Sequence, residues 1–280
     1  MIGVVGDLVE DIAVRLRTAV NVASDTSADI RRRRGGSAAN TAVAVTRMGR
    51  RSRFIGQVGD DSVGTTLTDA LTAEGVDVVV RRGGRSGTIV LLIDTSGERT
   101  MLADRAACTD LSDPDPLWLD GLTVLHLPLY SLVGEPLAAT TRTLIGWARD
   151  RGVAVSIDAA SAGVIAERGV DRTLADLAAI SPDILLCNAL EAEALGGLDA
   201  LTAIGARATI VKDGPRPALV VSGGHLTEVD ALPIEAVGDT TGAGDAFAAG
   251  FLVAWTEGAA PADAAAAGHA SAHRAITRET

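Results

Sequence analysis

The chain carries LTVLHL at 122–127, VAVSID at 153–158, DILLCN at 183–188 and ATIVK at 208–212, four short apolar runs that decide its fold. Stretches with helical character lie between them, from Glu135 to Arg151 and near 171–180. Strands and helices that alternate in this way form parallel β-α-β units, with helices on both faces of the sheet. We therefore predict an α/β fold, a three-layer sandwich around a mostly parallel central sheet.

Polar residues stand at the ends of the predicted strands. A further buried strand is expected at IGVVG (2–6), which is followed directly by a carboxylate. Ligands of such sheets bind beyond the carboxyl ends of the strands, so we expect the chemistry at one rim. The residues predicted to point toward this rim are Asp7, His126, Asp158, Asn188 and Lys212.

Two other segments differ from this pattern. They are short alternating stretches around polar turns, which indicates β-hairpins, and they read IAVRLRTAV (12–20) with SADIRRRR (27–34), and GTIVLLID (87–94) with ERTMLAD (98–104). We predict a single domain over residues 1–280, with a small β-sheet lid formed by 12–34 and 87–104. The arginines at 31–34 are expected to be a solvated strand end.

The composition limits the partners. The chain has 280 residues, of which 47% are hydrophobic, and a formal net charge of -11. This length can bury a sizeable core, whereas the negative charge disfavours nucleic acid and anionic membranes as partners. Cys108 and Cys187 lack the spacing of a metal site or a disulfide framework, and the N-terminus lacks the features of a signal peptide. We therefore expect a soluble, cytoplasmic protein.

The most informative motif is DTTGAGDAF at 239–247, which runs into an apolar helix. Glycine lets the backbone approach an anion closely, and the free N–H groups and dipole of a helix N-terminus favour negative charge. We expect the amides of Gly242, Ala243 and Gly244 to stabilise a phosphoryl group, and Asp245 to accept a proton from an incoming hydroxyl. The simpler interpretation is a glycine turn with Asp245 as a helix cap.

A second motif, GGSAANT at 35–41, leads into another predicted helix. Its glycines permit a tight turn, and Asn40 offers both a donor and an acceptor to neighbouring hydroxyls. Both motifs, in this order, resemble those of the ribokinase-like carbohydrate kinases, the PfkB family. The resemblance implies a ribokinase-like fold, ATP and Mg²⁺ as cofactors, and a homodimer that packs through the lid.

The resemblance also assigns residues across the chain. Asp11, Gly36, Ser37 and Asn40 correspond to acceptor positions, and Asn188 to a position near the nucleotide phosphates. Glu191 corresponds to a residue that acts on magnesium through water. Lys212, Gly214 and His269 correspond to nucleotide-binding positions. The alternatives are an ordinary helix start at Asn188, a surface lysine at Lys212 and a packed histidine at His269.

The sequence departs from the family pattern at several places. Ser37 and Tyr130 stand where the members most similar to ribokinase carry Lys and Glu, which argues against ribose as the substrate. Arg105 lies where relatives acting on 2-keto-3-deoxygluconate place an arginine that could pair with a carboxylate. A monovalent-cation site would use Asp239 and Thr241, but the glycine-containing segment that completes it is absent after Ile276, so potassium activation is doubtful.

The leading hypothesis is therefore ATP-dependent phosphorylation of a hydroxyl group of a sugar or a sugar-like small molecule, with Asp245 as the general base. A nucleoside kinase of the adenosine type is the alternative within the enzymes, although only 2% of the residues are aromatic and could stack on a base. The alternative outside catalysis is a catalytically silent sugar- or nucleotide-binding protein.

Overall fold

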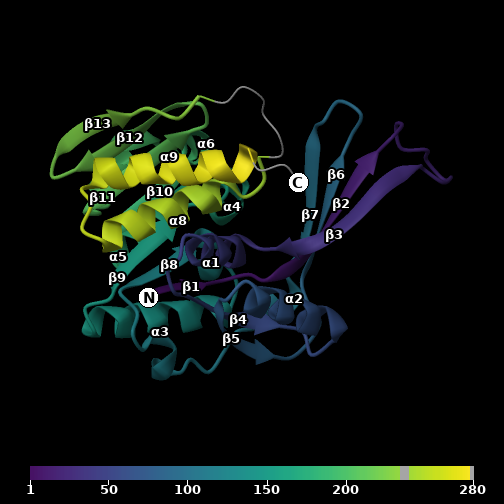
Figure 1. Ribbon diagram of the computed structural model, residues 1–280, viewed down its shortest axis with the longest axis horizontal. Coiled ribbons are helices and arrows are strands. Elements are labelled where there is room, and N and C mark those ends of the chain that lie inside the picture. The colour runs from purple at the N-terminus through teal and green to yellow at the C-terminus, as the bar shows by residue number, and fades with distance from the viewer. Residues whose placement is uncertain (234–239, 278–280) are drawn as a thin grey trace.

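The computed structural model describes residues 1–233 and 240–277, and it is built around a nine-stranded sheet (Figure 1). The strands, in sheet order, are β13 (His225–Val229), β12 (Arg216–Ser222), β11 (Ala208–Asp213), β10 (Ile184–Asn188), β9 (Ala154–Asp158), β8 (Val124–Pro128), β1 (Ile2–Val5), β4 (Ser52–Val58) and β5 (Asp77–Arg82). All neighbours from β11 to β5 are parallel, while β12 and β13 are antiparallel. The predicted mostly parallel central sheet is confirmed.

Helices cover both faces of this sheet. One face carries α1 (Ser37–Arg47), α2 (Ser62–Ala73), α8 (Ala243–Thr256) and α9 (Pro261–Thr277). The other carries α3 (Leu137–Asp150), α4 (Ala162–Arg168), α5 (Val170–Ile180), α6 (Ala189–Ala194) and α7 (Gly197–Ala203). Short 3-10 helices are η1 (Ala106–Thr109), η2 (Pro116–Leu119) and η3 (Leu129–Leu132). No helix within the described ranges is long and apolar enough to cross a membrane.

The two hydrophobic cores follow from the alternation of side chains along the strands. Val4 and Val5 are neighbours in β1, yet Val4 packs in the core under α1 and α8, and Val5 in the core under α3. Both side chains are fully buried. A parallel strand covered on both faces is apolar at most positions, which is why the central strands read as apolar runs with few polar residues, such as His126 and Ser156.

A separate four-stranded sheet projects from the main body (Figure 1). Its order is β3 (Ala28–Gly35), β2 (Val9–Leu16), β6 (Thr88–Ile93) and β7 (Arg99–Asp104). Each hairpin is antiparallel, and the two hairpins meet through the parallel pair β2 and β6. The predicted small second sheet is confirmed, and its first strand begins at Val9, slightly earlier than expected.

Helices α8 and α9 pack closely against each other because glycine faces the contact. A Cβ at position 250 would lie 2.6 Å from the carbonyl oxygen of Ala267, so no larger residue fits without moving a helix. A Cβ at position 268 would lie 3.0 Å from the ring of Phe247. The two glycines therefore allow the close packing of α8 against α9.

We predict that Gly250→Ala lowers the free energy of unfolding by about 1–3 kcal/mol, because the added methyl group overlaps the backbone of α9. Urea denaturation measures this change. Gly146→Ala in α3 is the matched control, since nothing lies within 4 Å of the new Cβ, and it should stabilise the protein through helix propensity. Equal gains in both variants would contradict the proposed close packing.

Candidate active site

The N-terminal turn of α8 holds the carboxylate of Asp245. The turn is entered through Gly242, whose φ of 79° is left-handed and favours glycine. Two side chains of α1 donate to this carboxylate: Ser37 Oγ lies 2.5 Å from Oδ1, and Asn40 Nδ2 lies 3.0 Å from Oδ2. Residues from the two predicted motifs, about 200 positions apart, therefore meet at one carboxylate.

Two glycines place α1 at this point. Gly36 has a φ of 100°, and a Cβ there would lie 2.2 Å from the carbonyl oxygen of Asp7. A Cβ at Gly35 would lie 2.1 Å from Oδ1 of Asp11, so the Asp11 carboxylate packs directly against the backbone of Gly35. Burial raises the pKa of Asp11, while Arg33, at 3.8 Å, acts in the opposite direction. The carboxylate of Asp11 thus lies at the start of the same turn.

The environment makes Asp245 a stronger base than an exposed aspartate. Burial, with a smaller contribution from the charge of Asp158, raises its pKa to about 6. The hydrogen bonds from Ser37 and Asn40, and the charge of Lys212, favour the ionised form and limit the rise. At neutral pH the carboxylate is ionised, yet it remains basic enough to accept a proton.

Arg34 makes a contact that the sequence did not predict. Its Nη1 donates to Oδ1 of Asn40 at 2.9 Å, while Nδ2 of the same amide donates to Asp245. The guanidinium therefore fixes which end of the Asn40 amide faces the carboxylate. The expected solvated strand end describes the arginines at 31–33, which are exposed in β3, but not Arg34, which is partly buried. The sequence signal for this difference is that the run stops directly before the Gly35–Gly36 turn.

A buried ion pair lies on the other side of the α8 N-terminus. Lys212 Nζ lies 2.6 Å from Oδ2 of Asp158, and both side chains are only 12% exposed. Burial lowers the pKa of Lys212, but the charges of Asp158 and Glu191 outweigh it and raise the pKa overall. A Cβ at Gly244 would lie 3.7 Å from Nζ, so the ammonium group stands beside the glycine turn.

Asn188 and Glu191 form a reciprocal capping box at the start of α6. The Asn188 side chain accepts from the Glu191 amide at 2.9 Å, and the Glu191 carboxylate accepts from the backbone and side chain of Asn188 at 2.8 and 2.7 Å. Burial and the charge of Asp158 raise the pKa of Glu191 to about 7. Among the described residues, no group of three or more acidic, Cys or His side chains could hold a metal ion.

The other two positions predicted to bind nucleotide, Gly214 and His269, lie after β11 and in the final helix. Gly214 has a φ of 56° in the turn between β11 and β12. His269 is 7% exposed, its ring meets Phe247 edge-on at 5.1 Å, and its Nε2 has no partner within the described part of the chain. The packed-histidine alternative therefore describes the contacts of His269 well.

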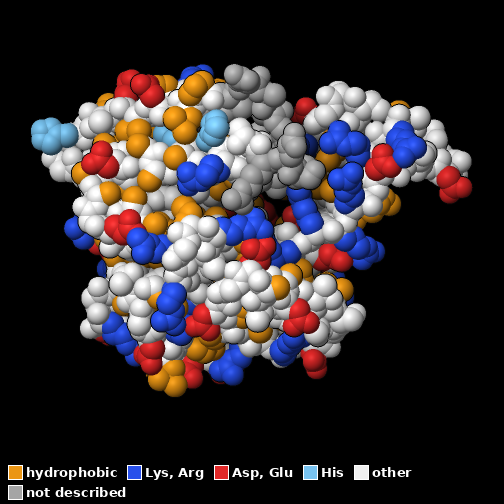
Figure 2. All heavy atoms as spheres, viewed as in Figure 1, with side chains coloured by type: hydrophobic (Ala, Val, Ile, Leu, Met, Phe, Trp, Pro, Cys, Tyr) orange, Lys and Arg blue, Asp and Glu red, His pale blue; other side chains and the backbone are white. Residues whose placement is uncertain are grey.

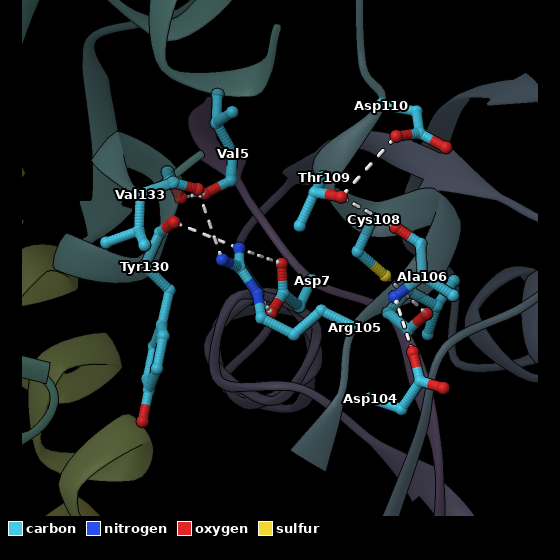
Figure 3. Close-up of polar contacts among 12 residues, drawn as sticks. Val5, Asp7, Asp104, Arg105, Ala106, Cys108, Thr109, Asp110, Tyr130 and Val133 are labelled. Carbon is cyan, nitrogen blue, oxygen red and sulfur yellow. Dashed lines mark hydrogen bonds and ion pairs between the residues drawn. The ribbon is translucent and has the colours of Figure 1, made fainter. Parts of the chain in front are cut away.

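Arg105 is bound within the protein (Figure 3). Its Nε and Nη2 lie 2.6 and 2.8 Å from the two carboxylate oxygens of Asp7, and other N–H groups reach the carbonyl oxygens of Tyr130 and Val133. Asp7 follows β1 and Arg105 follows β7, so this bidentate pair ties the projecting sheet to the central one. Arg105 consequently points at Asp7 rather than presenting free donors to a ligand.

One further position, His126, differs from the prediction. His126 is buried inside the sheet and contacts Ser156 Oγ at 3.0 Å, and burial lowers its pKa to about 4, so it does not face the rim. Of the expected cation ligands, Asp239 lies outside the described residues. Thr241 Oγ1 accepts from Arg99 of β7 at 3.2 Å, which brings the projecting sheet to the α8 turn.

Comparisons with known proteins identify the family of the chain. The sequence matches the family described as pfkB family carbohydrate kinase over residues 2–280. The chain belongs to this kinase family. It is 32% identical to a fructokinase of Klebsiella pneumoniae, covering 78% of this chain and 75% of the relative. A fructokinase of Salmonella typhimurium is 31% identical, over 82% and 79% of the two chains.

Solved structures share the fold of this kinase. The adenosine kinase from Sinorhizobium meliloti has a TM-score of 0.87 at 25% identity, covering 99% of this chain and 94% of its own. The fructokinase of Halothermothrix orenii has a TM-score of 0.81 at 22% identity, covering 97% of both chains. The predicted family and the ribokinase-like fold are therefore confirmed.

The structure of the kinase brings most of the predicted residues into two groups. The first is formed by Asp11, Gly36, Ser37, Asn40, Gly242, Ala243 and Asp245. The second, beyond Gly244, holds Asn188, Glu191 and Lys212 together with Asp158, which the sequence had placed only at the rim. Arg105 reaches the first group indirectly, since the backbone of its partner Asp7 lies against Gly36.

We predict that Lys212→Met lowers the free energy of unfolding by about 3–5 kcal/mol, because it leaves the carboxylate of Asp158 buried without its counter-ion. Urea denaturation at neutral pH measures the loss. Arg17→Met is the matched control, since the Arg17–Asp29 pair is exposed and should contribute little. Similar losses in both variants would show that burial of the Lys212–Asp158 pair does not increase its contribution to stability.

Proposed function

We propose that this kinase transfers the γ-phosphoryl group of ATP to a hydroxyl group of a sugar or sugar-like molecule. The observation that carries the proposal is the position of the Asp245 carboxylate in the first turn of α8, where Ser37 and Asn40 donate hydrogen bonds to it. Its raised pKa suits a general base that works near neutral pH. The match to the carbohydrate kinase family over residues 2–280 supports the same reaction.

The proposed steps use groups on both sides of the α8 turn. Asp245 accepts the proton of the acceptor hydroxyl, while Asp11, Gly36 and Asn40 orient the acceptor. The backbone amides of residues 242–244 lie at the N-terminus of α8, where negative charge is favoured, and would stabilise the charge of the transferred group. The amide of Ala243 donates to the carbonyl oxygen of Thr240 at 3.1 Å, so it would have to turn from this carbonyl to the phosphoryl group or share its hydrogen. The small side chains at 242–244 keep these amides accessible.

The second group of residues is the proposed nucleotide side. Lys212 supplies positive charge beside Gly244, and Asn188, Gly214 and His269 would border the nucleotide. Glu191 would hold Mg²⁺ through water: its raised pKa reflects burial and the neighbouring Asp158, and a cation would favour its charged form. When bound, Mg²⁺ neutralises charge on the phosphates. A related E. coli fold, 22% identical with a TM-score of 0.85, was solved with ATP and Mg²⁺.

The projecting sheet is proposed to act as a lid formed by 12–34 and 87–104 of the single domain 1–280. Closure would exclude water, which competes with the acceptor for the phosphoryl group, and the Arg99–Thr241 contact supports this role. Ile30, Met101 and Leu102 of this sheet are exposed, which supports the proposed homodimer through the lid. Cytoplasmic action stays a prediction, supported by two free, buried cysteines.

Nucleoside phosphorylation is the second candidate. It is favoured by the likeness to the Sinorhizobium meliloti adenosine kinase, at a TM-score of 0.87. It is disfavoured by the scarcity of aromatic residues, only 2% of the chain, that could stack on a base. Comparison of ADP release with fructose, ribose, 2-keto-3-deoxygluconate and adenosine separates the two candidates.

We predict that Asp245→Asn lowers kcat by about 10²–10⁴-fold, as expected for loss of a general base, while calorimetry still detects ATP binding. The matched control is Asp263→Asn, which makes the same chemical change in the first turn of the neighbouring helix α9 and should keep full activity. Unchanged turnover in Asp245→Asn would exclude Asp245 as the base.

We also predict a pH effect from Ser37→Ala. Activity needs the ionised base, so kcat/KM should fall as the pH drops through the pKa of Asp245, about 6. Removing the Ser37 hydrogen bond takes away a contact that favours the ionised form, so the pKa rises and this limb of the kcat/KM profile moves to higher pH. Ser62→Ala, at an exposed position of α2, should leave the profile in place. A shift to lower pH in Ser37→Ala would contradict the assignment.

A further inference from the structure

A pocket rich in arginine opens beside the proposed acceptor residues. It has a volume of about 730 Å³ and is lined by Asn40 and Gly242 at one end and by α1 and the last turns of α9 along its length. Its charged lining residues are Arg33, Arg34, Arg47, Arg274 and a single acid, Asp11. Figure 2 shows Lys and Arg side chains gathered where the projecting sheet meets the body. In a chain with a net charge of -11 this concentration of positive charge is local.

Part of this charge is balanced within the protein. Arg47 pairs with Glu74, with Nε and Oε2 2.8 Å apart, and Arg33 lies 3.8 Å from Asp11. Arg34 is different: burial lowers its pKa, which means that its charge lacks full compensation. Within residues 1–233 and 240–277 its only hydrogen bond goes to Asn40, and Arg274 has no acceptor at all.

The position of Arg34 indicates whether it would bind the acceptor or the nucleotide. Only the Asn40 amide separates its guanidinium from the carboxylate of Asp245, so Arg34 lies on the acceptor side of the α8 turn. The ammonium group of Lys212 stands beside Gly244 and does not line the pocket. A negative group bound by Arg34 would therefore belong to the acceptor rather than to the nucleotide.

We propose that the acceptor is a sugar derivative with a carboxylate or a phosphate group, and that Arg34 and Arg274 bind this group. The proposal rests on the phosphotransfer function inferred above and narrows its substrate class. Guanidinium groups bind such oxyanions through paired hydrogen bonds. The partly buried setting of Arg34 strengthens its hydrogen bonds, while Arg274 is exposed at the end of α9. Arg105, the arginine that the sequence favoured for this task, is already occupied by Asp7.

The test uses two matched pairs of acceptors with the full chain and MgATP. Gluconate and sorbitol differ by a carboxylate, and fructose 6-phosphate and fructose differ by a phosphate. ADP release gives kcat/KM for each, and calorimetry gives the affinity without turnover. We expect the acidic member of at least one pair to be preferred about tenfold or more, the size of one charge-assisted contact. The pair that shows the preference identifies the acid group.

Three variants test whether Arg34 and Arg274 cause the preference for the acidic acceptor. Arg274→Gln and Arg34→Gln should each reduce the ratio of acidic to neutral affinity about tenfold. Arg31→Gln removes the same charge from an exposed position of β3 outside the pocket and should leave the ratio unchanged. Equal affinity for both members of each pair, or a preference that survives both pocket variants, would overturn the proposal. Absence of phosphorylation with every acceptor would instead overturn the kinase function, because the affinity ratio is measured separately.

Discussion

The position of the proposed general base depends on one contact, the two hydrogen bonds that Ser37 and Asn40 donate to the carboxylate of Asp245. It joins the N-terminal turns of two helices that lie on the same face of the sheet, and it holds a charge where helix N-termini favour one. The left-handed turns at Gly36 and Gly242 bring these two helix starts close enough for the contact to form. Substrate groups can then be oriented on one side of this contact and nucleotide groups on the other.

Burial explains which parts of the fold could be predicted from the sequence. The strands between 122 and 212 are covered on both faces, so their apolar runs are continuous and easily found. At one end of the sheet β12 and β13 were missed, because exposed positions interrupt their pattern and β13 is exposed over most of its length. At the other end β4 and β5 were missed as well, and in β4 the polar residues Arg53 and Gln57 interrupt the apolar run. The small sheet was predicted because its hairpins show alternating residues around polar turns. The ends of β3, β6 and β7 agree with the prediction to within one residue, whereas β2 runs over Val9–Leu16 rather than 12–20.

The site residues that lie within one short motif could be predicted from the sequence. Contacts between side chains far apart in the chain were harder to predict. The glycine turns and Asp245 belong to two local motifs. By contrast, Arg105 meets Asp7, and Lys212 meets Asp158, across separations that no local pattern reveals. The contact between Lys212 and Asp158 could be expected only because both residues end parallel strands, whose carboxyl ends lie at the same edge of the sheet.

The parallel pairing of β2 with β6 has a consequence for the order of folding. The two strands are separated in the chain by β3, α1, β4, α2 and β5, so the β2–β3 hairpin is synthesised long before its parallel neighbour exists. During synthesis it presents an unpaired edge, and its closure waits on a contact between distant parts of the chain. The first-made strands of the small sheet are therefore completed only after α1 and α2 have been made, and the nascent chain is most exposed to wrong pairing in that interval.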